Sequence, residues 1–333
     1  YNFALDYTQS NPLAISKDAA KYYTLGLSID GNRAMFEATG NLIYLDRCLD
    51  YINKMINDAV LSSTLSASQF KDSYLGWIYS LTGNEQSLGE FYCWRYVVRV
   101  LDVIKDYNLG TSYQTAYNSI MAFTERNIWQ KWYARGATAW LYRTAVHICS
   151  HVCLVAHFLR RRSTNPTIVS QATILHNNID NLGIPAFNGS NFRAQIVSHP
   201  VDARMKYWKS YWEGIPASGK PVELKGSDTS HGAAFITYVI EMYERGYGSW
   251  SIEDISGFAA LFQFLWINSN STWNWLIGPS GTDIYSPHNI NDGFNKLGRF
   301  NVNIQKLIES VSSSRNAQHY GNGALNAKKL LGV

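Results

Sequence analysis

The sequence predicts an all-α fold of about a dozen helices, joined as helical hairpins. Apolar residues recur at helical spacing, for example at Leu45, Leu49 and Ile52 within segment 42–56. A Thr-Gly-Asn turn at 39–41 joins two such segments, and the same turn recurs at 82–84. A period of roughly 40 residues is typical of arrays of helical hairpins. Segments of strict alternation are few, so we expect no strand series.

The elements are expected in the following order along the chain. Residues 1–16, which include Pro12, form an irregular arm. Helices are predicted over residues 18–39, 42–56, 70–81, 88–104, 111–128, 138–161, 167–181, 199–212, 235–243, 252–266, 302–311 and 324–331. Long loops at 183–200 and 277–299 are candidates for functional segments. Nothing resembles a flexible linker, so a single domain over residues 1–333 is predicted.

Composition places the chain among globular proteins and argues against several partners. Apolar residues make up 46% and charged residues 16% of the chain, so disorder is not expected. The net charge is +4. The clearest basic run of the chain, 160–162, lies at the C-terminal end of a predicted helix, where the helix dipole favours cations. We therefore expect no nucleic-acid partner. No apolar run is long enough to span a membrane. We also expect the protein to be a monomer.

The cysteines and paired histidines do not form a convincing metal motif. None of the four cysteines lies in a CxxC pair, and buried free thiols are predicted. His147 and His151 share a helix face but lack the Glu of an HExxH motif. They are interpreted first as polar residues of the core or of a groove. We expect no metal and no cofactor.

Two segments carry a resemblance to a known group of proteins. They are Ala38-Thr-Gly-Asn-Leu-Ile-Tyr-Leu-Asp-Arg-Cys-Leu49, and Asp228-Thr-Ser-His231-Gly, which is followed by a helix and a Tyr-Glu-Arg-Gly turn. Both resemble the α/α toroids of carbohydrate-active enzymes, and most of all the polysaccharide lyases that act on alginate or glucuronan. The resemblance implies an α/α toroid, an incomplete barrel of helical hairpins, with a groove over its inner helices.

The resemblance also implies a reaction, a partner and a location. Such a lyase cleaves a 1,4-linked uronate polymer by β-elimination, so its partner is an anionic polysaccharide. The reaction needs a base near C5, an acid at the leaving oxygen and a group that neutralises the carboxylate. The chain begins at Tyr1 rather than Met, which a cleaved signal peptide explains as well as trimming does. We expect a secreted or periplasmic protein.

The leading catalytic candidates are His231 and Tyr285. His231 precedes a helix and has a side chain suited to proton transfer near neutral pH. Asp228 is expected to orient its ring or to cap the helix. Tyr285 lies in a polar loop and is the candidate acid, or both base and acid, with His288 as the alternative in that loop. A capping or core role for His231, and a plain surface role for Tyr285, are the competing interpretations.

Two further catalytic candidates and three aromatic residues complete the predicted site. Glu90 would contact the uronate carboxylate if burial raised its pKa, and Arg135 is a candidate carboxylate clamp. Substrate binding is assigned to Trp94, Trp208, Trp212, Asp228 and His288. Trp208 and Trp212 share a face of the predicted helix 199–212 and form either a sugar platform or part of the core.

Two other functions remain open at this point. A toroidal glycoside hydrolase would need a pair of carboxylic acids across the groove. Its candidate acids are Glu90, Asp228, Glu213 and Asp283. A non-catalytic glycan-binding toroid would need aromatic stacking alone.

Overall fold

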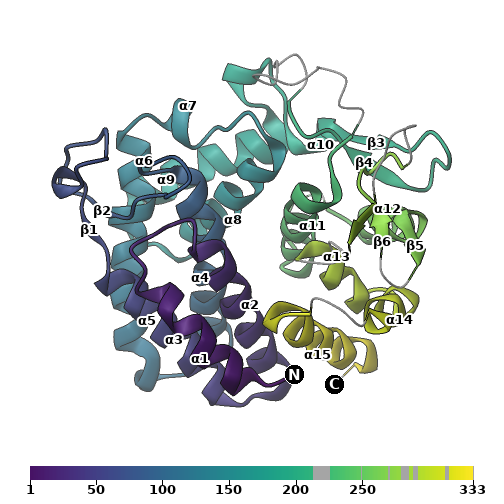
Figure 1. Cartoon of the computed structure of the whole chain (residues 1–333). Coiled ribbons are helices and arrows are strands. Elements are labelled where there is room, and N and C mark those ends of the chain that lie inside the picture. The colour runs from purple at the N-terminus through teal and green to yellow at the C-terminus, as the bar shows by residue number, and fades with distance from the viewer. Residues whose placement is uncertain are drawn as a thin grey trace. The chain divides into compact units, whose positions relative to one another are not determined.

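The computed structural model describes two compact units of the chain. The described residues are 1–212, 226–248, 250–268, 271–278, 285–287, 292–311 and 315–332, with 285–287 described as backbone. Unit 1 comprises 1–142, 154–176 and 316–321, and unit 2 comprises 143–153, 177–315 and 322–333. Figure 1 shows that helices form most of both units, which confirms the all-α class. The single domain stays a prediction.

Unit 1 is built from consecutive helices with one short two-stranded sheet. Its helices are α1 (Phe3–Ala14), α2 (Tyr22–Thr39), α3 (Leu42–Asn57), α4 (Ser87–Asp106), α5 (Thr111–Phe123), α6 (Lys131–Ala134), α7 (Ala137–Trp140) and most of α9 (Pro166–Asn177). Its strands β1 (Val60–Leu61) and β2 (Leu75–Gly76) pair antiparallel. A 3₁₀ turn spans Ser62–Thr64 and a π-helical segment spans Thr124–Gln130. The second half of α8 (Val146–Arg162) and the first residues of α15 (Ala317–Leu331) also belong to unit 1.

Unit 2 surrounds two longer helices with short strands. Its helices are α10 (Phe192–Gln195), α11 (Thr229–Glu244), α12 (Ile252–Leu265), α13 (Gly293–Lys296) and α14 (Val302–Ser310). Strands β3 (Ile196–Ser198) and β4 (Lys206–Trp208) form an antiparallel pair, and β5 (Trp266–Asn268), β6 (Ser271–Trp273) and β7 (Tyr285–Pro287) form a three-stranded sheet. A π-helical segment spans Asn178–Leu182, and 3₁₀ turns span Pro185–Phe187 and Leu297–Arg299.

The first predicted hairpin turn is confirmed in detail. Gly40 ends α2 with a left-handed φ of 72°, and its amide donates to the Phe36 carbonyl. Asn41 then caps α3 by accepting a hydrogen bond from the Ile43 amide. Glycine adopts the left-handed conformation without a steric penalty, and asparagine satisfies an unpaired amide at the helix start. The turn therefore reverses the chain with only local interactions.

Other sequence-based expectations are wrong. Residues 1–16 are not an irregular arm, because Asn2 caps α1 through the amides of Ala4 and Leu5. Segment 70–81 is not a helix, and it contains β2 instead. Segment 199–212 is also not helical, because it forms a turn followed by β4. The expectation of no strand series overlooked these short pairs.

Unit 1 places residues 316–321 directly against α2. A Cβ added to Gly31 would lie 2.3 Å from the Ala317 carbonyl carbon, and one added to Gly321 would lie 2.1 Å from the Gly31 oxygen. Gln318 Nε2 donates to Asp30 Oδ2 at 2.8 Å and to the Tyr96 hydroxyl at 3.2 Å. The two backbones can approach this closely only because both contact positions are glycine.

We predict that Gly31→Ala destabilises the chain by about 1–3 kcal/mol, because the added methyl group overlaps backbone atoms that cannot move aside. Gly323→Ala is the matched control, since its Cβ would meet only Gln305 Nε2 at 3.8 Å. At this helical position alanine should be neutral or stabilising by up to about 1 kcal/mol. Urea unfolding measures both. Equal stability of the two variants would contradict the close approach.

Candidate functional site

A carboxylate and an imidazole form a pair at the start of α11. Asp228 Oδ1 accepts hydrogen bonds from the amides of Ser230 and His231, both at 2.9 Å, and so caps the helix. Asp228 Oδ2 lies 2.6 Å from His231 Nδ1. The His231 side chain is 56% exposed, whereas that of Asp228 is 19% exposed. Both predicted roles of Asp228, orienting the ring and capping the helix, are therefore present.

The chain on both sides of the pair is held by backbone bonds. Asp228 forms an isolated antiparallel bridge with Trp275, and the Thr229 amide donates to the Asn274 carbonyl at 2.8 Å. One helical turn into α11, Gly232 packs against the Trp208 ring, which lies 3.1 Å from its Cβ position. The capping residue thus has a fixed backbone position, which in turn limits where the imidazole can lie.

A second histidine lies beside the pair. The His147 ring, at the start of α8, is centred 4.3 Å from the His231 ring, and His151 lies 6.2 Å from His147. An antiparallel bridge between Ala145 and Tyr211 fixes the chain just before α8. The sequence placed His147 in the core or in a groove, and gave no signal that it would meet His231.

Electrostatics keep the capping carboxylate charged. Burial raises the pKa of Asp228, but its hydrogen bond with His231 and the nearby imidazoles outweigh this effect, so the net pKa lies below 3.8. Since Nδ1 of His231 faces this carboxylate, Nε2 is the ring nitrogen placed to exchange a proton with a ligand. An exposed imidazole oriented by a carboxylate is a common general acid–base device.

The other loop candidates are only partly described. Tyr285 begins β7, where its backbone pairs with Trp273 in β6. Its side chain, and the whole of His288, lie outside the described residues, as do Glu213 and Asp283. Trp273 belongs to the same unit as His231. The roles of Tyr285 and His288 therefore stay predictions.

Glu90 and Arg135 lie in unit 1, within a buried network of charges. Lys131 Nζ donates to Glu90 Oε1 at 2.6 Å and lies 3.6 Å from Glu85 Oε1. Trp132 Nε1 donates to Glu90 Oε2 at 2.6 Å. The side chains of Glu85, Glu90 and Lys131 are all 0% exposed. Burial, reinforced by Glu85 and opposed by Lys131, raises the pKa of Glu90, as the sequence argument required.

Arg135 is already engaged by carboxylates of its own chain. Its Nε and Nη2 atoms donate to Asp72 at 2.8 and 2.9 Å, and Nη2 also donates to Glu85 Oε2 at 3.3 Å. Its guanidinium stacks over Phe70, 3.9 Å from the ring centroid. A bidentate carboxylate clamp is therefore present, but its described partner is Asp72.

The three tryptophans assigned to substrate binding lie in the core. Trp94 is 0% exposed and donates from Nε1 to Thr124 Oγ1 at 2.8 Å. Trp208 and Trp212 are each 1% exposed, and Trp212 Nε1 donates to the Arg143 carbonyl. Their burial favours the core interpretation that the sequence left open for such aromatics.

Half-buried aromatic residues occur elsewhere and were missed from the sequence. Tyr23 and Tyr92 stack with ring centroids 3.8 Å apart, and Tyr79 lies 6.1 Å from Tyr23. Tyr23 lies in α2, Tyr92 in α4 and Tyr79 in the segment before α4, so no local spacing connects them. Only the packing of α2 against α4 reveals the cluster.

Metal and membrane features can be stated for the described part of the chain. Within it, no group of three or more His, Cys, Asp or Glu side chains could hold a metal ion. None of its helices is both long and apolar enough to cross a bilayer. All four cysteines are buried free thiols, which confirms the sequence prediction.

Comparisons with known proteins give little. No family model and no curated protein matches the chain. One similar solved structure is an inactive variant of an α-1,6-mannanase of glycoside hydrolase family 76 from Salegentibacter sp. HEL1_6, bound to α-1,6-mannotriose. It is 9% identical, the match covers 99% of each chain, and the TM-score is 0.46. Likeness of this degree transfers neither activity nor substrate to this chain.

These findings change one part of the sequence-based interpretation and support another. The predicted all-α class is confirmed by the described elements, and the toroid arrangement stays a prediction. The resemblance to alginate and glucuronan lyases is wrong, because the similar structure is a glycoside hydrolase. The prediction of a lyase enzyme that acts by β-elimination is corrected with it.

We predict that Lys131→Met destabilises unit 1 by about 3–5 kcal/mol, because Glu85 and Glu90 lose the buried cation between them. Adding Glu90→Gln should recover part of this loss, since it removes the carboxylate that has lost its cation, whereas Glu85 keeps its contact with Arg135. Chemical denaturation of both variants measures the coupling. A double variant that is less stable than Lys131→Met alone would contradict the assignment.

We also predict a pH-dependent difference between Glu90→Gln and the wild type. The folded-state pKa of Glu90 is raised above 4.5, so the protonated carboxyl stabilises the wild type at low pH. This contribution is lost as the pH rises through the folded-state pKa, whereas glutamine does not titrate. The stability of the variant relative to the wild type should therefore increase above pH 4.5. Denaturation across a pH series checks this, and a constant difference would contradict it.

Proposed function

We propose that this chain is a glycoside hydrolase that acts on a polysaccharide, with His231 as a proton-transfer residue. The observation that carries the proposal is the 2.6 Å contact between His231 Nδ1 and the largely buried Asp228 carboxylate. It orients an imidazole that is 56% exposed at the start of a helix, with Nδ1 rather than Nε2 facing the carboxylate. The resemblance of the Asp228–His231 segment to carbohydrate-active enzymes supports a carbohydrate substrate.

The roles of the two residues follow from their charges. Asp228 has a lowered pKa and stays ionised near neutral pH, so it cannot donate a proton to a leaving group. It stabilises and orients the imidazole instead, while Nε2 accepts a proton from an attacking water. Hydrolysis also needs an acid at the leaving oxygen. We keep Tyr285 as the candidate for that role.

The remaining site predictions become proposals of lower rank. Glu90 and Arg135 are proposed to support the fold of unit 1 rather than to contact the reacting atoms, since their described partners are Lys131 and Asp72. We further propose that the protein acts as a monomer and outside the cytoplasm, as a secreted or periplasmic enzyme.

We predict that His231→Ala lowers kcat by roughly 10²–10⁴-fold, the range for loss of a general acid–base group. Asp228→Asn should lower kcat by at least about tenfold while preserving stability, because asparagine caps a helix as well as aspartate does. The assay measures reducing ends released from α-1,6-mannan, dextran and β-1,4-glucan. Lys306→Ala, an exposed substitution on α14, is the control for general effects of mutation.

The same assay separates the alternatives. Reducing ends that depend on His231 support the hydrolase. Binding of a polymer without any cleavage would instead identify a non-catalytic glycan-binding protein. Full activity of His231→Ala on a cleaved polymer would remove this residue from the mechanism.

A further inference from the structure

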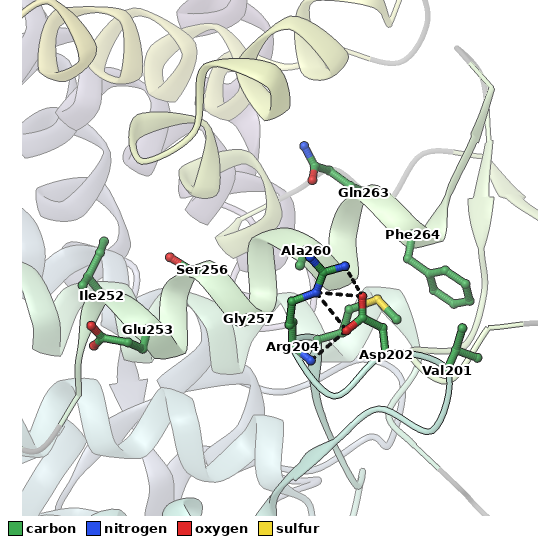
Figure 2. A pocket seen from close by; sticks show the side chains of 11 residues that line it. Val201, Asp202, Arg204, Ile252, Glu253, Ser256, Gly257, Ala260, Gln263 and Phe264 are labelled. Carbon is green, nitrogen blue, oxygen red and sulfur yellow. Dashed lines mark hydrogen bonds and ion pairs between the residues drawn. The ribbon is translucent and has the colours of Figure 1, made fainter.

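A cavity of about 630 Å³ lies along the exposed face of α12 in unit 2, separate from the Asp228–His231 pair. Figure 2 shows Glu253 towards one end of this face and Phe264 towards the other. Ser256 and Ala260 line it between them, because residues four apart share a helix face. The stretch from Ile252 to Phe264 gives a groove roughly 18 Å long at the helical rise per residue. This length suits several units of an extended polymer.

Close packing fixes the opposite wall, which is formed by the turn at 201–205. A Cβ added to Gly257 would lie 2.5 Å from Lys206 Cγ and 3.3 Å from the Arg204 carbonyl oxygen. Only glycine at this position lets the chain lie directly on α12. At the far end, the half-buried Phe264 ring packs edge-on against His199 at 5.0 Å. Both walls are therefore held in place without a ligand.

Two planar polar groups of the groove, the Arg204 guanidinium and the Asp202 carboxylate, orient each other through hydrogen bonds. Arg204 donates from Nε to both oxygens of Asp202 at 3.1 Å, and from Nη2 to Oδ2 at 2.6 Å (Figure 2). Hydrogen bonds from Arg204 lower the pKa of Asp202 to about 2, so the pair stays ionised and its charges cancel. The Arg204 side chain remains 87% exposed, which leaves its guanidinium accessible to a ligand.

Three other polar side chains line the groove without strong internal partners. Glu253 forms no ion pair within the described chain, and its carboxylate accepts a hydrogen bond from Ser251. Ser256 and Gln263 form no side-chain hydrogen bond with any described residue. With Asp202 and Arg204 neutralising each other, the groove carries the single negative charge of Glu253. It is therefore poorly suited to a polyanion.

We propose that this groove binds a segment of an uncharged glycan chain, at a site distinct from the Asp228–His231 pair. Guanidinium, carboxylate and amide groups hydrogen-bond to sugar hydroxyls, and the partly exposed Phe264 and Ala260 side chains offer apolar surface for the C–H groups of the sugar ring. The proposal rests on the proposed function for its polymer class. It adds that the polymer is neutral, and that a second site holds it.

The test measures binding with the His231→Ala variant, in which cleavage of the polymer is expected to be much slower. Affinity electrophoresis in gels that contain α-1,6-mannan, dextran or β-1,4-glucan should show retardation by at least one of them. Within that background, Arg204→Ala and Gln263→Ala should each weaken binding about two- to tenfold, the effect of losing one or two hydrogen bonds. Lys306→Ala removes an exposed cation from the same unit outside the groove, and should bind normally.

The outcomes separate this proposal from the proposed function. The proposal of a glycan-binding groove is overturned if the groove variants bind as tightly as Lys306→Ala. It is also overturned if only the charged polymers alginate or chitosan retard the protein, or if no polymer does. On a short soluble oligosaccharide, groove variants with intact His231 should keep wild-type kcat, because the short ligand does not reach both sites. Absent cleavage combined with groove-dependent binding would overturn the hydrolase and leave the groove standing.

Discussion

An ionised side chain can be buried only beside a partner, and this constraint decides where chemistry can take place in the chain. In unit 1 it locks Glu90 and Glu85 around Lys131, and Arg135 onto Asp72. Those side chains are of the types found in catalytic sites, but in unit 1 their charges are paired with one another. At α11 the balance differs, because the buried partner is the carboxylate and the exposed one is the imidazole.

The parts of the fold that were predictable are those determined by neighbours in sequence. The turn at Gly40 and the cap by Asn41 need only a left-handed residue followed by a side-chain acceptor, and both are visible in the letters. The Asp228 cap and its contact with His231 are likewise three residues apart. Such local geometry is the reason why the cap and the ring contact could be predicted from the sequence.

The failures have equally specific causes. Trp208 and Trp212 are four residues apart, which places them on one face of a helix, but an even spacing also places them on one face of an extended chain. Residues 1–16 were predicted to be irregular because they contain Pro12, although Asn2 caps α1 at its start. Lys131 meets Glu90 across 41 residues, and no periodicity encodes that contact. The reaction class was wrong because a shared architecture supports both elimination and hydrolysis.

The contact between α2 and residues 316–321 has a consequence for how the chain is made in the cell. Asp30 and Gln318 are 288 positions apart, and ribosomes add roughly 5–20 residues per second. The surface of α2 around Gly31 therefore waits roughly 15–60 s after its synthesis before its partner segment emerges. The contact between α2 and residues 316–321 cannot form before that segment is made, so a nascent chain that stalls before Ala317 cannot complete unit 1. Unit 1 can therefore be completed only after 288 further positions have followed Asp30.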